Sequence, residues 1–146
     1  MTGTADQKPV RSGQRLVREY FDARNAGDAE HATRFLATDF VRHSPPKLVG
    51  IPAYNAWLVA LRTMWADEIW RILGLATEGD RVWAWLMNES THVGLWHGLQ
   101  PTGRRVSFET VNIFRIRDQK IAEMWRVADD WSRFRQLGGE VVWPRA

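Results

Sequence analysis

The sequence predicts a single α+β domain, with helices in its first half and a meander of long antiparallel strands in its second half. Apolar residues recur at helical spacing as far as Trp65, and after Asp67 they alternate with polar residues, as in strands with one buried face. The length of 146 residues suits one domain with one hydrophobic core. We expect a flexible N-terminus at residues 1–12, one domain over residues 13–140 and a C-terminal tail at residues 141–146.

Three helices are expected before the long strands. The first begins at Ser12 and ends near Asn25, where apolar residues stop recurring at helical spacing. Asp28 then caps a short second helix, which we expect to end near Thr38. Pro52 suits the first turn of a third helix. The apolar stripe of that third helix consists of Tyr54, Trp57, Leu58, Leu61 and Trp65.

The extended segments follow from alternation and from turn residues. We expect four long strands at residues 69–76, 81–92, 104–117 and 120–128. Turns at residues 78–80 and 118–119 join two pairs into antiparallel hairpins, and residues 96–103 form a loop at the rim. Before the third helix, the adjacent prolines Pro45 and Pro46 indicate a brief extended piece that ends at His43 and continues as a loop. A sheet curled around the helices would enclose an apolar interior.

The composition argues against several classes of protein. An apolar fraction of 45% and a charged fraction of 25% are ordinary for a globular chain. The absence of cysteine excludes disulfides and thiolate metal sites. The net charge of +3 comes from interspersed basic and acidic residues, which argues against nucleic acid as a partner. No apolar run approaches the roughly 20 residues that cross a bilayer, so we expect a cytoplasmic protein without a membrane partner.

Several segments together carry a family resemblance. The most distinctive are residues 92–106 (HVGLWHGLQPTGRRV) and 111–121 (VNIFRIRDQKI), preceded in order by residues 40–43 (FVRH) and 65–67 (WAD). Over residues 14–138 the chain resembles the SnoaL-like polyketide and ester cyclases of the nuclear transport factor 2-like superfamily. The resemblance implies an α+β cone, in which three N-terminal helices pack in a curved, mainly antiparallel sheet. It also implies a homo-oligomer that binds an apolar natural-product intermediate with no metal or organic cofactor.

The resemblance implies a catalytic pair that this chain lacks. In such cyclases, an aspartate on the last long strand and a histidine on the preceding strand assist an intramolecular aldol closure. Alignment places Arg126 at the aspartate position and Asn112 at the histidine position. Arginine stays protonated, so it cannot accept a proton from carbon, although it can hold an enolate or a carboxylate. Asparagine can orient a group or donate a hydrogen bond.

Two roles are open for each of these residues. Asn112 contacts a ligand or makes a structural hydrogen bond, and Arg126 contacts substrate or forms an ion pair, because a buried polar group needs a partner. The candidate partners of Arg126 are Asp39, Asp67, Glu89, Asp129 and Asp130.

His43 and Asp67 are the remaining acid/base candidates. A neutral imidazole with a pKa of about 6.5 is a competent base if it reaches the pocket, whereas the alternative is a loop histidine bonded to backbone. Asp67 is expected where the third helix ends, at the mouth of the cone, as a catalytic or a solvated carboxylate. The predicted substrate-binding residues are Tyr20, Trp57, Trp65, Phe108, Phe114, Met124, His92 and Trp96.

The leading functional hypothesis is a cofactor-independent cyclase or related isomerase that acts on an apolar polyketide-like intermediate. One alternative is a hydrolase, epoxide-opening enzyme or hydroxylase with a carboxylate-bound water beside Arg126. A non-catalytic small-molecule-binding domain is the other. The histidine spacing does not fit common metal motifs, so no metal is expected. Trp83 and Trp85 are expected on the outer face of the sheet, where they would support a homodimer or higher homo-oligomer.

Overall fold

The computed structural model describes residues 12–146 and has the α+β layout that the sequence predicts. The helices are α1 (Gly13–Asn25), α2 (Ala29–Thr33), α3 (Ile51–Arg62) and α4 (Asp130–Gln136). The strands are β1 (Leu36–Arg42), β2 (Leu48–Val49), β3 (Trp65–Glu78), β4 (Arg81–His92), β5 (Arg105–Arg117) and β6 (Lys120–Ala128). Apart from Ser12, the N-terminal segment that we expect to be flexible lies outside the described residues.

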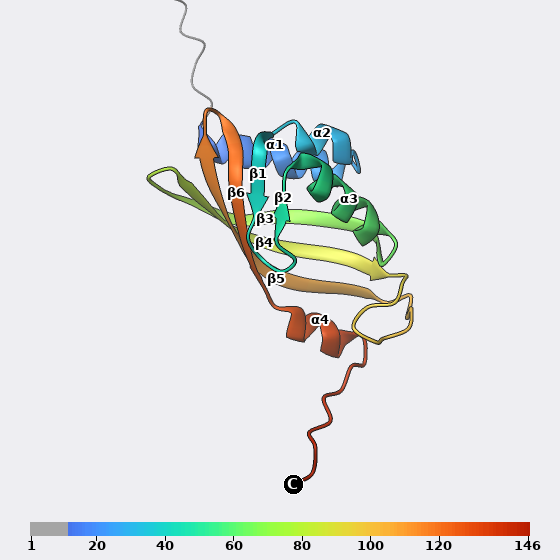
Figure 1. Cartoon of the computed structure of the whole chain (residues 1–146). Helices are drawn as coiled ribbons and strands as arrows, with labels where there is room; N and C mark the ends of the chain where they lie inside the picture. The colour runs from blue at the N-terminus through green and yellow to red at the C-terminus, as the bar shows by residue number, and fades with distance from the viewer. Residues whose placement is uncertain (1–11) are drawn as a thin grey trace, which may run out of the picture.

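All six strands form one sheet in the order β2-β1-β6-β5-β4-β3. The pairs are antiparallel except for β1 and β6, which are parallel. Figure 1 shows that the sheet twists strongly, with α1, α2 and α3 against one face and α4 at the far end of β6. The curved, mainly antiparallel sheet with three N-terminal helices is therefore confirmed.

The core lies between α1 and the inner face of the sheet. Ser12 caps α1 by accepting a hydrogen bond from the Arg15 amide at 3.1 Å, so that the helix begins where its apolar stripe begins. The stripe packs against alternate residues of the long strands, as the period of two predicts. Its members and their partners are Leu16, Val17, Tyr20, Phe21, Val82, Ala84, Leu86, Phe114 and Met124. Trp83 and Trp85 alternate with this set and are 41% and 48% exposed on the outer face.

The second helix is shorter than predicted. It ends at Thr33 instead of near Thr38, and Leu36 already belongs to β1, where it pairs with Ile121 of β6. The amide of Ile121 donates to the carbonyl of Phe35 at 2.9 Å, which ties this segment to the sheet. Pairing with a strand about 85 residues away overrides the local helical spacing.

The third helix also ends earlier than the apolar stripe suggested. It ends at Arg62, and Trp65 is the first residue of β3, paired with His92. The predicted position of Asp67 at the end of this helix is therefore wrong. The register shifts between Ala66 and Ile69, where the φ of 52° at Asp67 marks a β-bulge.

The bulge adds a residue to β3, so that Trp65 and Glu68, three positions apart, both face inward.

The fourth helix was not predicted, although its cap is readable in the sequence. Asp129 accepts a hydrogen bond from the Ser132 amide at 2.9 Å and starts α4. Gln136 then holds the helix against β5 by hydrogen bonds to the backbone of Ser107, at 2.7 Å and 3.0 Å. Between residues 12 and 146, the helices are too short or too polar to cross a membrane.

Candidate active site

A cavity of about 420 Å³ opens between α3, the inner face of the sheet and α4. Its lining comes from seven helices and strands and from the loops between them. The lining residues are Arg24, Arg42, Pro45, Pro46, Tyr54, Trp57, Leu61, Met64, Trp65, Glu68, Trp70, Trp96, His97, Phe108, Asn112, Met124, Arg126, Asp130 and Arg133.

Aromatic rings form much of the cavity wall, and arginines lie against them. Trp65 and Trp96 meet edge to face, with ring centroids 5.2 Å apart. The guanidinium of Arg133 lies 4.5 Å from the centre of Trp65, 4.3 Å from Trp96 and 4.4 Å from Phe108. Such cation–π contacts hold the side chain in place while the rings keep an apolar surface. The site therefore combines apolar walls with fixed positive charge.

Asn112 and Arg126 are direct neighbours across the β5–β6 pair, since their Cα atoms are partners in the register. Asn112 is 4% exposed, and its Oδ1 accepts a hydrogen bond from Thr110 Oγ1 at 2.9 Å. Within residues 12–146 its amide nitrogen has no hydrogen-bond partner, so it can donate to a ligand in the cavity. The structure thus places side by side the two residues that the family resemblance aligns with the catalytic pair.

Arg126 is held only loosely by protein groups. Of its five candidate partners, Asp130 is the one within 4 Å in the described part of the chain, with 3.9 Å between Arg126 Nη2 and Asp130 Oδ1. The same oxygen accepts a much closer hydrogen bond from Arg133 Nη2 at 2.7 Å. Burial lowers the pKa of Arg126, although Asp130 opposes this effect. Burial likewise lowers the pKa of Arg133, to about 10, so both guanidinium groups remain charged at neutral pH.

Arg42 reaches the cavity from the end of β1. It is 2% exposed and lies 4.4 Å from the ring centre of Trp57. Its Nη1 donates to the backbone carbonyls of Ser44 and Pro46, at 2.6 Å and 2.7 Å. No carboxylate of residues 12–146 forms an ion pair with it. Burial lowers the pKa of Arg42, and the nearby charge of Arg126 lowers it further.

An ion pair between α1 and β3 closes one end of the cavity. Arg24 Nη2 donates to Glu68 Oε1 at 2.6 Å, and Trp70 Nε1 donates to the same oxygen at 2.7 Å. Burial opposes ionisation of Glu68, but the charge of Arg24 and the hydrogen bonds to the carboxylate outweigh it and lower the pKa. Arg24 Nη1 also donates to the hydroxyl of Tyr20, which shares a 2.5 Å hydrogen bond with Tyr54. Burial raises the pKa of Tyr54, so this phenol is neutral at pH 7.

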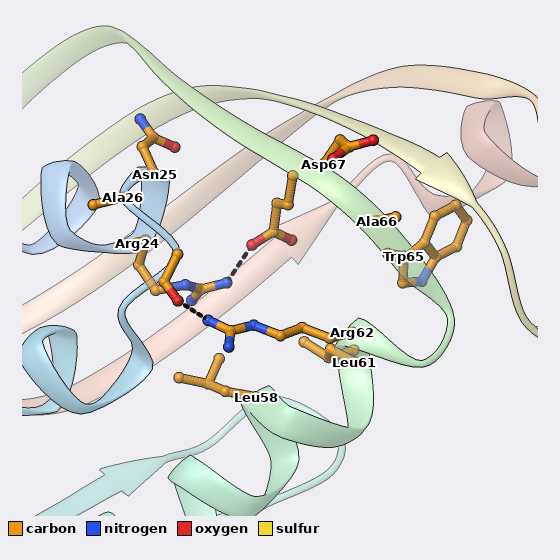
Figure 2. A pocket seen from close by; sticks show the side chains of 11 residues that line it. Arg24, Asn25, Ala26, Leu58, Leu61, Arg62, Trp65, Ala66 and Asp67 are labelled. Carbon is orange, nitrogen blue, oxygen red and sulfur yellow. Dashed lines mark hydrogen bonds and ion pairs between the residues drawn. The ribbon is translucent and has the colours of Figure 1, made fainter.

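This ion pair also lines a second cavity, of about 410 Å³ (Figure 2). Arg24, Leu61, Trp65 and Glu68 line both cavities. Figure 2 shows Arg62 reaching across the second cavity, where its Nη2 donates to the carbonyl of Gly27 at 2.6 Å. The Arg24–Glu68 pair is therefore a partition that the two cavities share.

Most of the predicted substrate-binding residues line the first cavity. They are Trp57, Trp65, Phe108, Met124 and Trp96, together with Asn112 and Arg126. Tyr20 and Phe114 are instead packed in the core. His92 is fully buried, and its Nδ1 accepts the amide hydrogen of Thr102 at 3.2 Å.

Neither acid/base candidate reaches the first cavity. His43 follows β1 on the outer face, where its Nε2 lies 2.9 Å from Glu123 Oε1 and its ring stacks on Trp125 at 4.6 Å. Asp67 lines the second cavity, because the β-bulge turns Glu68 toward the first. Of the four candidate catalytic residues, only Asn112 and Arg126 therefore line the first cavity.

The sequence analysis named Asp130 as a possible partner of Arg126, but it missed the four other charged residues of the cavity. The inward position of Arg42 could have been predicted, since Arg42 is two residues after the buried Phe40 on β1. Asp130 and Arg133 are three positions apart, directly after the helix cap Asp129, so their common helix face could also have been predicted. The inward position of Glu68 could not have been predicted, because no local pattern indicates the bulge that turns it inward. No three His, Cys, Asp or Glu side chains of residues 12–146 are grouped to hold a metal ion.

Comparison with known proteins decides the family. The sequence profile of the SnoaL-like polyketide cyclases matches residues 14–137. The chain belongs to this family. It is 31% identical over 134 residues to the aklanonic acid methyl ester cyclase DauD of Streptomyces sp. strain C5, a match that covers 88% of this chain and 82% of DauD. The SnoaL-like assignment thus agrees with the predicted cone and with the apolar cavity.

Solved structures of relatives show the same fold. TsrD from Streptomyces laurentii has a TM-score of 0.78 and 28% identity, and the match covers 94% of this chain and all of TsrD. AclR from Streptomyces galilaeus, described as a putative hydroxylase, has a TM-score of 0.76 and 26% identity, over 86% of this chain and 94% of AclR. The SnoaL-like scaffold therefore carries more than one described activity among relatives of this chain.

Proposed function

We propose that this protein is a cofactor-independent cyclase that closes a ring in an apolar polyketide-like intermediate, with Arg126 and Asn112 holding the developing enolate oxygen. The observation that carries the proposal is that these two residues are neighbours on the cavity wall, each with side-chain donors that no acceptor within residues 12–146 takes up at hydrogen-bond distance. Donors preorganised in a buried site stabilise an oxyanion more strongly than water does.

The reaction needs a proton carrier as well as these donors. A base takes a proton from the carbon beside a carbonyl, and the enolate carbon then forms a bond to a second carbonyl carbon of the same molecule. The alkoxide that results takes a proton, so that substrate and product have the same atoms. Arg126 remains protonated throughout and stabilises charge without transferring a proton.

Asp130 is our proposed base, because it has fewer hydrogen bonds from protein donors than Glu68, the other carboxylate in the cavity. Its side chain is 47% exposed and accepts one close hydrogen bond, on Oδ1 from Arg133, whereas one oxygen of the more buried Glu68 accepts hydrogen bonds from both Arg24 and Trp70, and the pKa of Glu68 is lowered. A carboxylate so stabilised in its ionised form is a weak base. Asp130 lies 3.9 Å from Arg126, so the proton acceptor and the oxyanion donor are side by side.

Hydrolysis, epoxide opening or hydroxylation on the same pocket, the last with dioxygen and a two-electron reductant as co-substrates, is the second candidate. It requires a carboxylate beside Arg126, and Asp130 meets this requirement at ion-pair distance. The description of AclR as a putative hydroxylase gives it further support. A non-catalytic binding domain is less well supported, because the cavity contains the carboxylates of Glu68 and Asp130.

Mass spectrometry separates these reactions. The test substrates are aklanonic acid methyl ester, which the name of DauD indicates for that relative, and the corresponding free acid. Ring closure gives a product of unchanged mass and new retention time, whereas hydroxylation adds an oxygen atom and hydrolysis adds water.

The variants Arg126→Gln and Asp130→Asn should lower kcat by roughly 100- to 1000-fold. The matched control Arg71→Gln removes the same charge on the outer face, where Arg71 pairs with Glu89, and should leave kcat unchanged. Formation of the isomer at equal rates by the two cavity variants and the control would contradict the proposal.

A further inference from the structure

The cavity carries more positive than negative charge. Among the described residues that line it, four arginines face two carboxylates, which leaves an excess of two positive charges when His97 is neutral. The arginines are Arg24, Arg42, Arg126 and Arg133, and the carboxylates belong to Glu68 and Asp130. An apolar pocket for a neutral ligand does not require this excess.

The pairing of these groups shows where the excess lies. Glu68 is taken by Arg24 at 2.6 Å, and Asp130 is taken by Arg133 at 2.7 Å. Arg126 is left with a 3.9 Å contact to an oxygen that already has a closer partner.

Arg42 has backbone carbonyls as its acceptors in place of a carboxylate. The uncompensated charge is therefore on Arg42 and Arg126.

These two arginines come from neighbouring strands. β1 and β6 are paired, and beyond the end of β1 the hydroxyl of Ser44 donates to the backbone carbonyl of Arg126 at 3.0 Å. Arg42 is 2% exposed, and its Nε has no hydrogen-bond partner in the described part of the chain. The Arg126 side chain is 18% exposed, and two like charges so far removed from water on adjacent strands are costly unless an anion lies between them or near them.

The rings around them indicate the rest of the ligand. The guanidinium of Arg42 lies over Trp57, and that of Arg126 lies 5.7 Å from the ring centre of Phe108. Trp65 and Trp96 also line the cavity, where the guanidinium of Arg133, already paired with Asp130, lies against both rings. A ligand with flat apolar rings and a negatively charged group at one end would fit both the aromatic wall and the two arginines.

We propose that the cavity takes an anionic ligand: a flat, largely aromatic molecule whose delocalised oxyanion binds to Arg42 and Arg126. The inference deepens the proposed function by naming its substrate class, and it rests on that function only for the location of the site. The oxyanion is either a free carboxylate or an ionised enol or phenol, since both present oxygen acceptors to a guanidinium fork.

The test is a binding measurement that involves no turnover. Titration calorimetry compares anthraquinone-2-carboxylate with its methyl ester, which has the same rings without the charge. The acid should bind on the order of 10- to 100-fold more tightly, since charge-assisted hydrogen bonds are the stronger kind. A hydroxyanthraquinone titrated through its phenol ionisation provides the second arm. Tighter binding of this phenolate alone would assign the oxyanion to an ionised enol or phenol.

Single substitutions identify which arginine gives the cavity its preference for the anionic probe. Arg126→Gln should remove most of the preference for the acid, whereas Arg71→Gln on the outer face should retain it. Arg42→Gln should act like Arg126→Gln, but Arg42 also holds the loop carbonyls of Ser44 and Pro46. Its thermal unfolding is therefore measured first, and Arg126→Gln carries the test if that loop is disturbed.

Two outcomes overturn the inference. One is that no anionic probe binds more tightly than its neutral counterpart, which includes the case in which none binds at all. The other is that Arg126→Gln and Arg71→Gln show the same preference. If either outcome is found but the protein still closes the ring of a neutral ester, the proposed function holds and only the inference fails. If the acid binds selectively but is not converted, the inference holds and only the proposed function fails.

Discussion

Replacement of Glu68 by alanine should lower the free energy of unfolding by about 3 kcal/mol. The change leaves Arg24 without its carboxylate and Trp70 Nε1 without its acceptor, at a place where the Arg24 side chain is only 10% exposed. Removal of one partner of a buried ion pair costs roughly 3–5 kcal/mol. Because the Glu68 side chain is 27% exposed, water can partly solvate the remaining guanidinium, which places the cost at the lower end.

Urea denaturation and thermal unfolding measure this cost. For a chain of this length, 1 kcal/mol corresponds to about 2–4 °C, so the expected fall in Tm is about 6–12 °C. Glu89→Ala is the matched control, because it breaks the Arg71–Glu89 pair on the outer face, where the Arg71 side chain is 60% exposed. Such an exposed pair contributes about 1 kcal/mol or less.

A double-mutant cycle with Arg24→Ala isolates the contribution of the pair from the loss of packing. The two single changes should be less than additive, since each removes the same interaction. If Glu68→Ala costs no more than Glu89→Ala, or if the two changes are additive, the Arg24–Glu68 partition does not contribute to stability as its geometry indicates.

Three further predictions follow from single contacts. The charge of Arg24 lowers the pKa of Glu68 against the effect of burial, so the stability that Glu68 contributes is present above its unfolded pKa of about 4.3 and is lost as the pH falls through the folded pKa. Urea unfolding over this acid range should show a steeper loss for the wild type than for Glu68→Gln; parallel curves would contradict it. His43→Ala should leave ligand binding and kcat unchanged, because the ring lies on the outer face, and a tenfold loss of kcat would require another location for the base. Gly94→Ala should destabilise the fold by about 1–3 kcal/mol in thermal unfolding, because the new Cβ would lie 2.1 Å from the carbonyl oxygen of Thr63; an unchanged Tm would show that the backbone shifts freely there.

The long strands were the most predictable part of the chain. Alternation over the 12 residues of β4 and the 13 residues of β5 assigned each side chain to a face, because a slip of one residue would expose a whole apolar set. Asn112 therefore lies on the inner face and Trp83 and Trp85 on the outer face, as the pattern indicated. Whether these tryptophans form an interface between copies of the chain stays a prediction.

Short segments were less predictable, because long-range pairing decides their structure. Phe35 and Leu36 have helical spacing to Ala32, yet the hydrogen bond from Ile121 to Phe35 and the pairing of Leu36 with Ile121 start a strand at Leu36. Trp65 continues the apolar stripe of α3 in sequence, but it pairs with His92 of β4. In both cases a partner strand more than 25 residues away satisfies the backbone better than another helical turn would.

The sequence by itself determined the fold class, the long hairpins, the SnoaL-like family and the apolar wall on which Asn112 and Arg126 lie. The tertiary structure alone decided the charged environment of that wall. Arg24 and Glu68 are 44 positions apart, and Glu68 faces Arg24 only because a β-bulge turns it inward and α1 packs beside β3. Local periodicity reports which face of its own element a residue occupies, whereas the pairing of charges depends on how separate elements pack together.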